Sequence, residues 1–509
     1  MHQTEPSTRR IARNTLMLYL RTLLSVVVGL YTSRVVLQIL GIDDYGIYGL
    51  VGGIVSMLGF LNTSMEEATS RFITYDLGLN NAENLKQTFN SAFQSHFIIA
   101  LIVVLFAETL GLWFVNNQLD IPQERYFAAN CIYQLSILSA VMGITQAPYS
   151  AVILAHEQMD VYAWFEILNA ILKLFVVWFL LLASYDKLIL YGILSFVLTV
   201  LIRSFYCIYC YRHYPESHLC LVWNPGNFRK MLSFTGWSIY ADASVSIRQQ
   251  GVNILINRFF GVALNAACSI AAIVQGIVWT CGYYVLAAFR PQITKQCAKK
   301  NYVLMQQMMT NSLKFTLLFS LLVSVPAFLS MSTLMGLWLG NVPEYAIIIA
   351  QILLIDNVFG LINHTFYIGI QSQGDIREFS LVNGTLKFFS LPCIFLLLVF
   401  VPNPTIPFVF NVAVLIVVTF FNLRLLKGKI PQLDLKSLLK PLSMVIFLGL
   451  FCLFMVLPLH FYLKEGLLHL SSVSLSYIIL LALGAYFLLF DKKERLILSQ
   501  MFPWNHRLV

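Results

Sequence analysis

The chain has 509 residues, of which 58% are hydrophobic and only 11% are charged, and its mean hydropathy is +0.75. A single water-soluble core could not bury so much apolar surface, so the composition excludes an ordinary soluble protein and predicts a polytopic membrane protein. The net charge of +9 would also suit a nucleic-acid-binding protein, but membrane topology accounts for the basic residues, and no nucleic acid is expected as a partner.

Apolar segments of about 20 residues or more recur along the chain, separated by charged or Pro/Gly-containing turns. They predict an all-α protein with about fourteen transmembrane helices. The first segment carries Arg21 and Arg34 and has no small-residue cleavage site, so we expect it to be retained as the first span. The predicted spans are 14–39, 46–69, 88–115, 126–154, 162–183, 188–211, 229–258, 263–289, 304–338, 345–370, 379–401, 406–425, 439–460 and 470–490.

The lysines and arginines between these spans fall mainly on one side of the membrane. With the N-terminus in the cytoplasm, 22 of them lie in inner segments and only Arg125, Lys187 and Lys464 lie in outer ones. Because cytoplasmic loops are enriched in basic residues, both termini are predicted to be cytoplasmic. The loops are too short to hold a folded domain, so the function is expected to lie within the membrane.

Two stretches separated by about 220 residues share a pattern. Leu40-Gly41-Ile42 is followed about 30 residues later by Arg71-Phe72-Ile73-Thr74, and Phe260-Gly261-Val262 is followed at nearly the same distance by Arg290-Pro291-Gln292-Ile293-Thr294. We interpret them as equivalent hairpins of two half-molecules, which is a repeat organisation typical of many transporters.

Several ionisable residues lie within the predicted spans, where each charge costs at least about 2.5 kcal/mol and is usually functional. Because the basic residues outnumber the acidic ones, the membrane interior is net basic. The basic residues are Arg21, Arg34, Lys173, Arg203, Arg248, Arg258, Lys314 and Lys387. The acidic ones are Glu108, Glu166, Asp242 and Asp356, with Glu66 and Glu67 near the inner end of the second span.

Each of these charges has a functional and a structural interpretation. Asp242 and Arg248 are about 120° apart around the seventh span, so each is expected to face a cavity or a partner on another helix. A buried ion pair that fixes helix register is the alternative. Glu166 and Lys173 share one face of the fifth span and could line a polar stripe. Basic side chains such as Arg258 could instead extend to lipid headgroups.

Motifs for catalysis and metal binding are missing from the sequence. It contains no GxxxxGK[ST], HExxH or GxSxG pattern. Cys207 and Cys210 have CxxC spacing, but they lie in a predicted span without a second Cys or His pair nearby, which favours packing over metal or redox chemistry. The chain is therefore not expected to be an enzyme or to carry a cofactor or metal.

Further motifs connect the chain with a known group of proteins. They are Leu40-Gly41-Ile42-Asp43-Asp44-Tyr45-Gly46-Ile47-Tyr48, Arg71-Phe72-Ile73-Thr74 with Leu77-Gly78, Arg248-Gln249-Gln250-Gly251, Asn253, Phe260-Gly261, Asn265-Ala266-Ala267 and Pro291-Gln292-Ile293-Thr294-Lys295. In these the chain resembles Wzx-type polysaccharide flippases, the lipid-linked oligosaccharide translocases of the multidrug/oligosaccharidyl-lipid/polysaccharide (MOP) exporter superfamily. It departs from them at Cys268-Ser269, where similar sequences carry Arg-Gly.

The resemblance implies a MATE-like fold, with two six-helix bundles in a V shape and two additional C-terminal helices. The implied domains are an N-terminal bundle over residues 1–227, a C-terminal bundle over 228–428, and two additional transmembrane helices with a cytoplasmic tail over 429–509. It also implies that the protein flips an undecaprenyl-pyrophosphate-linked oligosaccharide from the inner to the outer leaflet of the bacterial cytoplasmic membrane. The product would serve the biosynthesis of surface polysaccharide such as the O-antigen of lipopolysaccharide.

The implied mechanism is alternating access through a cationic central cavity, coupled to H+ or Na+, with polysaccharide assembly proteins as expected partners. Pyrophosphate must cross a low-dielectric slab, and fixed cations lower that barrier. We expect the anionic headgroup to be bound by Arg34, Arg248, Lys173 and Arg258. Ion coupling is assigned to Asp242, Glu166 and Asp356.

Three other functions remain as alternatives. A cation-coupled multidrug antiporter of the same fold would prefer an acidic cavity. A membrane-embedded polysaccharide polymerase or ligase would be expected to carry a sizeable outer loop. An uncoupled lipid scramblase is the third.

Overall fold

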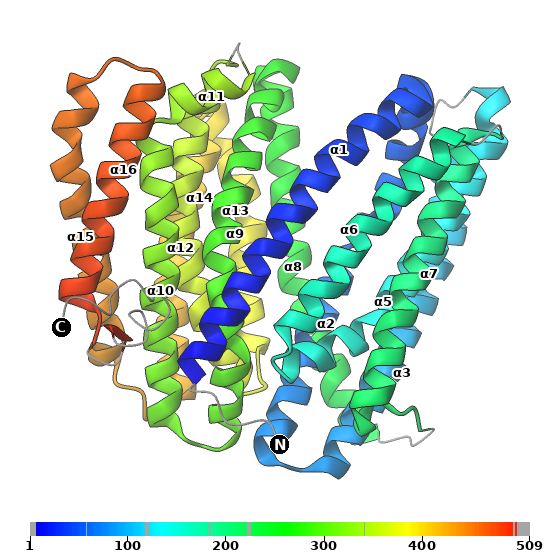
Figure 1. The fold of residues 1–509 in the computed structure, drawn as a ribbon, viewed down its shortest axis with the longest axis horizontal. Coiled ribbons are helices and arrows are strands. Elements are labelled where there is room, and N and C mark those ends of the chain that lie inside the picture. The colour runs from blue at the N-terminus through cyan, green and yellow to red at the C-terminus, as the bar shows by residue number, and fades with distance from the viewer. Residues whose placement is uncertain are drawn as a thin grey trace, which may run out of the picture. The chain divides into compact units, whose positions relative to one another are not determined.

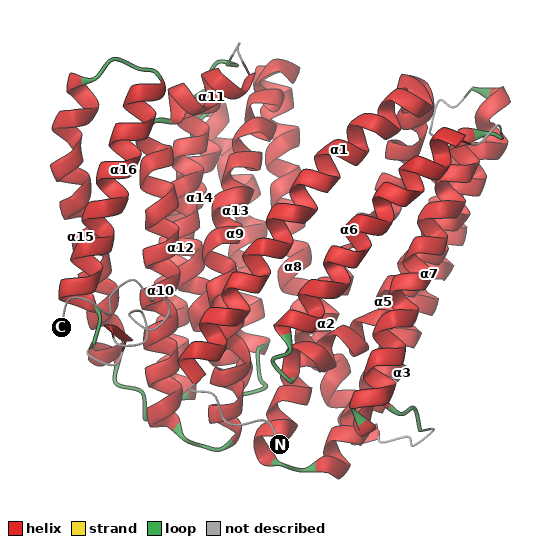
Figure 2. Ribbon diagram, in the orientation of Figure 1, coloured by secondary structure: helices red, strands yellow, loops and turns green. Residues whose placement is uncertain are grey.

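A computed structural model describes residues 7–56, 59–117, 122–182, 185–220, 225–339, 342–491 and 494–495. Within these residues every regular element is a helix (Figures 1 and 2). The predicted all-α fold is therefore confirmed. The chain forms two compact units, an N-terminal unit of Arg13–Asp242 and a C-terminal unit of Ala243–Val509 that also includes Met1–Ala12. The main boundary falls inside helix α8. The predicted division at 227/228 and 428/429 stays a prediction.

The N-terminal unit begins with α1 and ends within α8. Its helices are α1 (Ser7–Ser56), α2 (Gly59–Leu79), α3 (Ala82–Phe106) with the π-turn η1 (Ala107–Gly111), α4 (Leu112–Asn117), η2 (Gln123–Arg125), α5 (Tyr126–Ala155), α6 (Met159–Leu182), α7 (Lys187–His213), η3 (Pro215–Ser217) and α8 (Pro225–Phe260). Within this unit α5 packs against α2, α3 and α7, and α6 packs against α7.

The C-terminal unit continues from the second half of α8. Its further helices are α9 (Val262–Ala298), α10 (Tyr302–Leu329), α11 (Met331–Leu339), α12 (Ala346–Ser372), α13 (Arg377–Phe400), α14 (Ile406–Lys429), α15 (Leu435–Tyr462), α16 (Leu467–Gly484) and η4 (Ala485–Leu489). α12 packs against α9 and α14, whereas the C-terminal pair α15 and α16 packs against α10 (Figure 1).

Among the described residues, twelve helices are long and apolar enough to cross a membrane. The described parts of the predicted span 46–69 and the whole predicted span 229–258 are also helical, but neither belongs to this set. Charged residues such as Glu66, Glu67, Asp242 and Arg248 make these segments polar. The predicted span 304–338 is interrupted, since α10 ends at Leu329 and α11 begins at Met331. Hydropathy did not reveal this break because the apolar run continues through it.

Backbone conformations repeat between the two units at a spacing of 220 residues. Gly41 interrupts α1 at φ 78°, ψ 174°, and Gly261 separates α8 from α9 at φ 84°, ψ −176°. Positive φ is the conformation that glycine adopts without steric cost. Asn81 caps α3 and Asn301 caps α10, each through its side chain to the backbone N–H three residues later. These matching turns support the internal duplication expected from the sequence.

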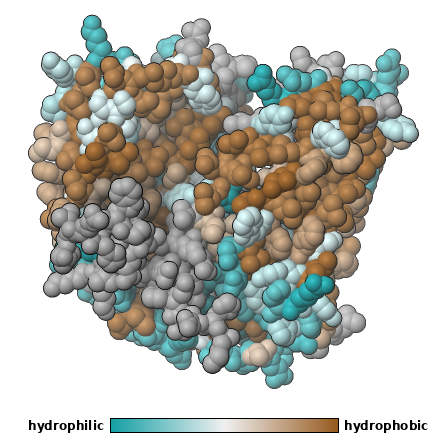
Figure 3. Space-filling view, in the orientation of Figure 1, coloured by the Kyte–Doolittle hydropathy of each residue, from teal (hydrophilic) through white to brown (hydrophobic). Residues whose placement is uncertain are grey.

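Large apolar side chains are exposed on the outside of the helices. On α15, Phe447 is 72% and Phe454 is 75% exposed, and they lie seven residues apart on one face. On the face drawn in Figure 3, hydrophobic side chains cover the middle and hydrophilic ones gather toward the ends. Such extensive apolar exposure is expected of a surface that lies in lipid.

Candidate functional site

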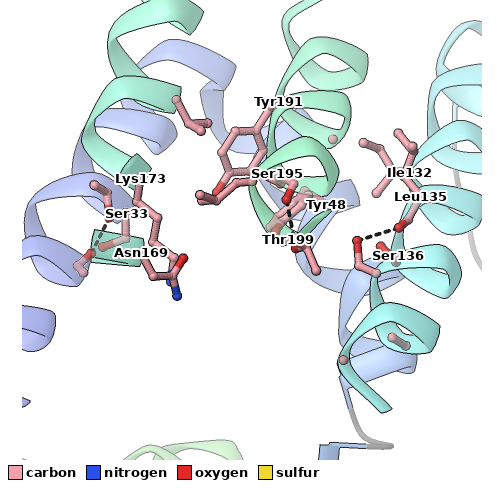
Figure 4. A pocket seen from close by; sticks show the side chains of 18 of the residues that line it. Ser33, Tyr48, Ile132, Leu135, Ser136, Asn169, Lys173, Tyr191, Ser195 and Thr199 are labelled. Carbon is pink, nitrogen blue, oxygen red and sulfur yellow. Dashed lines mark hydrogen bonds between the residues drawn. The ribbon is translucent and has the colours of Figure 1, made fainter. Parts of the chain in front are cut away.

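A cavity of about 820 Å³ lies inside the N-terminal unit, between α1, α2, α5, α6 and α7 (Figure 4). Its wall is unusually rich in neutral hydrogen-bonding groups for a membrane-spanning bundle. They include the hydroxyl residues Thr32, Ser33, Tyr45, Tyr48, Ser136, Ser139, Tyr191, Ser195 and Thr199 and the amides Asn62 and Asn169. These groups can donate to and accept from a polyhydroxylated ligand.

Lys173 contributes the cation among the residues that line this cavity, and Figure 4 shows it beside Asn169 and Ser33. Some hydroxyls already donate within their own helices: Thr199 to the Ser195 carbonyl oxygen at 3.0 Å and Thr32 to that of Gly29 at 3.1 Å. Their oxygens keep acceptor capacity for a ligand. The predicted placement of Lys173 at a cavity is thus consistent with the structure, and its role there remains a proposal.

A second polar cluster in the N-terminal unit is rich in carboxylates. Glu66 lies close enough to Arg21, Glu67 and Glu166 to interact electrostatically with all three. The Arg21 guanidinium carbon lies 5.3 Å from the centroid of the Tyr162 ring. Glu66 Oε1 is enclosed and has no hydrogen-bond partner. Glu66 is thus surrounded by two further carboxylates and one guanidinium, an arrangement suited to taking up a proton or a small cation.

The C-terminal unit holds a cluster in which basic residues outnumber acidic ones. Asp356 of α12 interacts electrostatically with both Arg248 of α8 and Lys387 of α13. Gln275 of α9 approaches the same carboxylate at 3.4 Å, and its own backbone carbonyl accepts a 2.9 Å hydrogen bond from Asn357. Arg248 is half-buried and its Nε is enclosed without a hydrogen-bond partner. Two cations and one carboxylate leave the cluster net positive.

The remaining predicted site residues are dispersed. Asp242, exposed on α8, accepts a short hydrogen bond from the Ser64 hydroxyl of α2. Arg34 on α1 and Arg258 near the end of α8 are both exposed. Arg34 is absent from the described residues that line the cavity, although the neighbouring Ser33 lines it. Glu166 joins the carboxylate cluster and is not among the described residues that line the cavity with Lys173.

Sequence reasoning gave too little weight to Arg21, Glu66 and Lys387, because a helix position alone does not show which neighbouring helix supplies the partner. Lys314, another basic residue of the predicted spans, does not extend toward lipid headgroups. Its Nζ instead lies 2.6 and 2.7 Å from the two carboxylate oxygens of Glu494, inside the C-terminal unit. That side chain is only 7% exposed, so the pair anchors the segment after α16 to α10.

Neither the family models nor the curated proteins searched contain a match to this chain. Several solved structures are similar in fold. An outward-facing multidrug resistance MATE family transporter of the MOP superfamily superposes with a TM-score of 0.69 at 13% identity, over 84% of this chain and 97% of that one. A MOP superfamily transporter from Pyrococcus furiosus, reported to have a binding pocket of reverse polarity, gives 0.69 at 12% over 84% and 97%.

A mutant of a MATE transporter from Vibrio cholerae is similar at a TM-score of 0.66 and 16% identity, over 84% of this chain and 99% of that one. At such low identity the likeness concerns the arrangement of helices. The chain therefore has the fold of the MATE-type transporters of the MOP superfamily.

Proposed function

We propose that this protein flips an anionic, undecaprenyl-pyrophosphate-linked oligosaccharide from the inner to the outer leaflet of the bacterial cytoplasmic membrane, for surface polysaccharide biosynthesis. The shared fold supports a transporter, and the polar chemistry of the two units supports this class of cargo. The lipid tail remains in the bilayer, while the polar headgroup passes along the protein.

The single observation that carries the proposal is the net positive cluster of Arg248, Lys387 and Asp356. A fixed pair of cations within a membrane-spanning bundle offsets part of the desolvation cost of a pyrophosphate. Asp356 holds the two cations together when no anion is present, since like charges alone would repel. An anionic headgroup can compete with Asp356 for them, so this cluster is suited to reversible anion binding.

The hydroxyl-rich cavity of the N-terminal unit supports a glycan as part of the same cargo. Neutral donors and acceptors match sugar hydroxyls, and Lys173 adds a cation for acidic sugars or phosphate. A drug-binding cavity is usually more apolar and aromatic.

One observation favours the second candidate, a cation-coupled multidrug antiporter. Glu66, Glu67 and Glu166 form an acid-rich cluster that could bind organic cations directly. Under the main proposal this cluster serves ion coupling instead, together with Asp242.

The test is the sidedness of lipid-linked glycan in cells depleted of the protein, measured with a membrane-impermeant lectin or periodate label on intact and opened cells. Accumulation that is labelled only after opening supports translocation. Accumulation accessible on intact cells would replace the proposal with a polymerase or ligase. Unchanged lipid-linked glycan together with increased sensitivity to cationic drugs would replace it with the antiporter.

A further inference from the structure

Three charged residues meet at one end of the N-terminal unit. Arg125, the last residue of η2, places one guanidinium nitrogen 2.5 Å from Asp44 Oδ2 and the other 2.5 Å from Asp186 Oδ2. Asp44 follows the turn of α1 at Gly41, and Asp186 immediately precedes α7. We call Asp44, Arg125 and Asp186 the clasp. Because both contacts are charge-assisted hydrogen bonds, the clasp ties together three segments that are far apart in sequence.

The carboxylates of the clasp are held in place by their surroundings. Asp186 Oδ1 accepts hydrogen bonds from the backbone N–H groups of Leu188 and Ile189 at 3.0 and 3.2 Å, so the same side chain also caps α7. The Asp44 side chain is only 9% exposed, whereas those of Arg125 and Asp186 are 37% and 34% exposed. Arg125 therefore bridges one buried carboxylate and one that water can reach.

The clasp lies just beyond one end of the hydroxyl-rich cavity. Tyr45 lines the cavity and directly follows the clasp residue of α1. Tyr191 lines it five residues after the clasp residue that caps α7, and Ile132 lines it seven residues after the clasp arginine. At about 1.5 Å per residue, these separations are at most about 11 Å along each segment. Since Arg125 and Lys187 belong to predicted outer segments, this is the outer end of the cavity.

Two tyrosines form the part of the cavity wall next to the clasp. Tyr48 of α1 and Tyr191 of α7 meet edge-on, with ring centroids 4.8 Å apart and planes at 63° (Figure 4). Both residues line the cavity, and Tyr48 lies about one helical turn after Asp44. A ligand that leaves the cavity at this end passes first the tyrosine pair and then the clasp.

The C-terminal unit closes its equivalent end without charges. The equivalent positions are Leu264, Tyr345 and Thr405, because Leu264 stands at the same distance after its glycine turn and the other two immediately precede α12 and α14. Leu264 is buried in an apolar cluster that includes Ala346 and Phe408. The same framework is therefore closed by apolar packing in one unit and by ion pairs in the other.

An apolar cluster and an ionic clasp differ in the free energy that opening them requires. Separating apolar side chains exposes their surface to water, which is unfavourable in proportion to the exposed area. Separating partly exposed ions lets water hydrate them, so much of the lost Coulomb attraction is recovered. The clasp of the N-terminal unit is thus suited to opening and re-forming, whereas the apolar cluster of the C-terminal unit is suited to staying closed.

We propose that the clasp is an outer gate of the N-terminal cavity, which opens to release the bound glycan toward the outer leaflet. The inference rests on the proposed function for the identity of this cargo. In the closed state Arg125 holds Asp44 and Asp186 together across the end of the cavity. In the open state the guanidinium and the carboxylates separate and are hydrated, and the ends of the three segments are free to move apart.

The gate gives separate roles to residues of the Leu40–Tyr48 motif. Gly41 forms the turn through its positive φ. Asp44 binds the clasp arginine, and Tyr45 and Tyr48 line the cavity behind it. The pattern that connects this chain with polysaccharide flippases therefore combines a turn, a gate residue and part of the cavity wall in one short segment.

The test measures how fast a membrane-impermeant methanethiosulfonate reagent reaches the cavity from outside intact cells. Ser136→Cys places a reporter thiol on the cavity wall. Tyr185→Cys places one beside the clasp, at a side chain that is 81% exposed, and reports on the outer surface itself. The full-length protein without either reporter gives the background labelling of its nine native cysteines.

Each reporter is combined with substitutions at the gate. Arg125→Gln removes both ionic contacts. Arg125→Lys keeps the charge but loses the planar fork that lets one side chain hold two carboxylates. Asp186→Asn weakens one contact while an asparagine can still cap α7. Lys187→Gln is the matched control, because it removes the same charge from an exposed residue next to the clasp. Circular dichroism and thermal unfolding establish that each purified variant is folded.

We expect Arg125→Gln to speed labelling of the Ser136→Cys reporter about fivefold to tenfold, because the closed state loses two charge-assisted contacts. Arg125→Lys and Asp186→Asn should speed it less, and Lys187→Gln should leave it unchanged. Asp186→Asn decides the question if Arg125→Gln does not fold.

Unchanged labelling in the folded gate variants, or an equal increase in Lys187→Gln, would overturn the gate. A Tyr185→Cys reporter that is not labelled from outside would also overturn it, since the clasp would then lie at the inner side. Depleted cells that accumulate no lipid-linked glycan would instead refute the proposed function and its cargo. The gate itself would survive that result, because labelling measures access to the cavity without any cargo.

Discussion

Ser136 and Asn169 in the N-terminal unit occupy the same helix positions as Asp356 and Lys387 in the C-terminal unit. Each is the eleventh residue of its helix: Ser136 of α5, Asn169 of α6, Asp356 of α12 and Lys387 of α13. In the N-terminal unit the two residues line the hydroxyl-rich cavity, and in the C-terminal unit the two residues belong to the charged cluster. Equivalent positions therefore carry neutral groups in one unit and an interacting pair of charges in the other.

The comparison teaches that the helix framework and the charges of a duplicated protein can diverge independently. The turns at Gly41 and Gly261 keep the same backbone geometry because both need positive φ. Charged side chains are constrained only by their local partners. In the N-terminal unit Glu66 has two carboxylates and one guanidinium beside it, whereas in the C-terminal unit Asp356 has two cations beside it. An anionic cargo and a coupling cation would each have a separate site.

The largest expected effect comes from removing Arg248, one of the two cations that interact with Asp356. Arg248→Gln keeps much of the side-chain length but leaves Asp356 with one cationic neighbour, so we expect surface glycan to fall about tenfold or more and inner-leaflet lipid-linked glycan to rise. Surface glycan is measured by lectin binding. Arg229→Gln, an exposed position on the same helix, serves as the control. Equal loss in both variants would contradict a specific role for Arg248.

The double substitution Asp356→Ser and Lys387→Asn gives the C-terminal unit the side chains that stand at the equivalent N-terminal positions, Ser136 and Asn169. Asp356→Ser alone leaves two cations facing each other, and Lys387→Asn alone weakens the balance around Asp356. The double variant should therefore regain about 1–3 kcal/mol of stability relative to the sum of the single variants. Thermal unfolding of the purified proteins measures this coupling. Strictly additive effects would mean that the two charges do not interact.

The carboxylate cluster of the N-terminal unit can be tested separately. Glu66→Gln removes an ionisable group whose Oε1 is enclosed, so we expect uptake driven by an imposed proton gradient in proteoliposomes to fall about fivefold or more. Binding of cargo without a gradient should stay unchanged, because the proposal assigns cargo binding to Arg248 and Lys387 and ion coupling to Glu66. Glu108→Gln, a carboxylate hydrogen-bonded to Gln134 at 3.1 Å, is the control. A loss of binding rather than of coupling would place Glu66 in the cargo site.

The smallest expected effect concerns two contacts that each join a turn to a helix end. One joins the turn after α5 to the end of α7, and the other joins the turn after α12 to the end of α14. In the N-terminal unit His156 Nε2 lies 2.6 Å from Glu216 Oε1, and in the C-terminal unit Lys429 Nζ lies 2.8 Å from Asp375 Oδ2, so the carboxylate belongs to the helix end in one unit and to the turn in the other. Burial alone would raise the pKa of Glu216, but the hydrogen bond from His156 lowers it overall. The hydrogen bond from Lys429 lowers the pKa of Asp375.

A carboxylate with a lowered pKa in the folded protein stabilises it above its unfolded pKa, near 4, and this stabilisation is lost as the pH falls through the folded pKa. Both pairs should therefore weaken below about pH 4. Glu216→Gln should loosen its turn more than Asp375→Asn, because the Glu216 side chain is 8% and that of Asp375 is 65% exposed, and exposed pairs contribute at most about 1 kcal/mol. Hydrogen exchange of the two turns measures the difference, and equal protection changes would contradict it.

The hydrophobic pattern predicted nearly all of the helices because each span must bury or expose some twenty residues of apolar surface, whatever its neighbours. It failed at Ser330, where the helix breaks without a change in hydropathy. The glycine turns were also predictable, since Gly41 and Gly261 stand in matching sequence patterns. The site residues were less predictable from the sequence. Arg248, Asp356 and Lys173 were assigned roles there, whereas Glu66, Lys387 and the partner of Lys314, Glu494, were not.

The sequence by itself determined that this is an all-helical membrane protein with an internal repeat and ionisable groups inside its spans, because these properties depend on composition and on spacing along one chain. Only the tertiary structure decided which of those groups meet. Arg248, Asp356 and Lys387 come from three helices, so their proximity depends on how the helices pack. A contact between side chains far apart in sequence leaves no trace in the hydrophobic period of either helix.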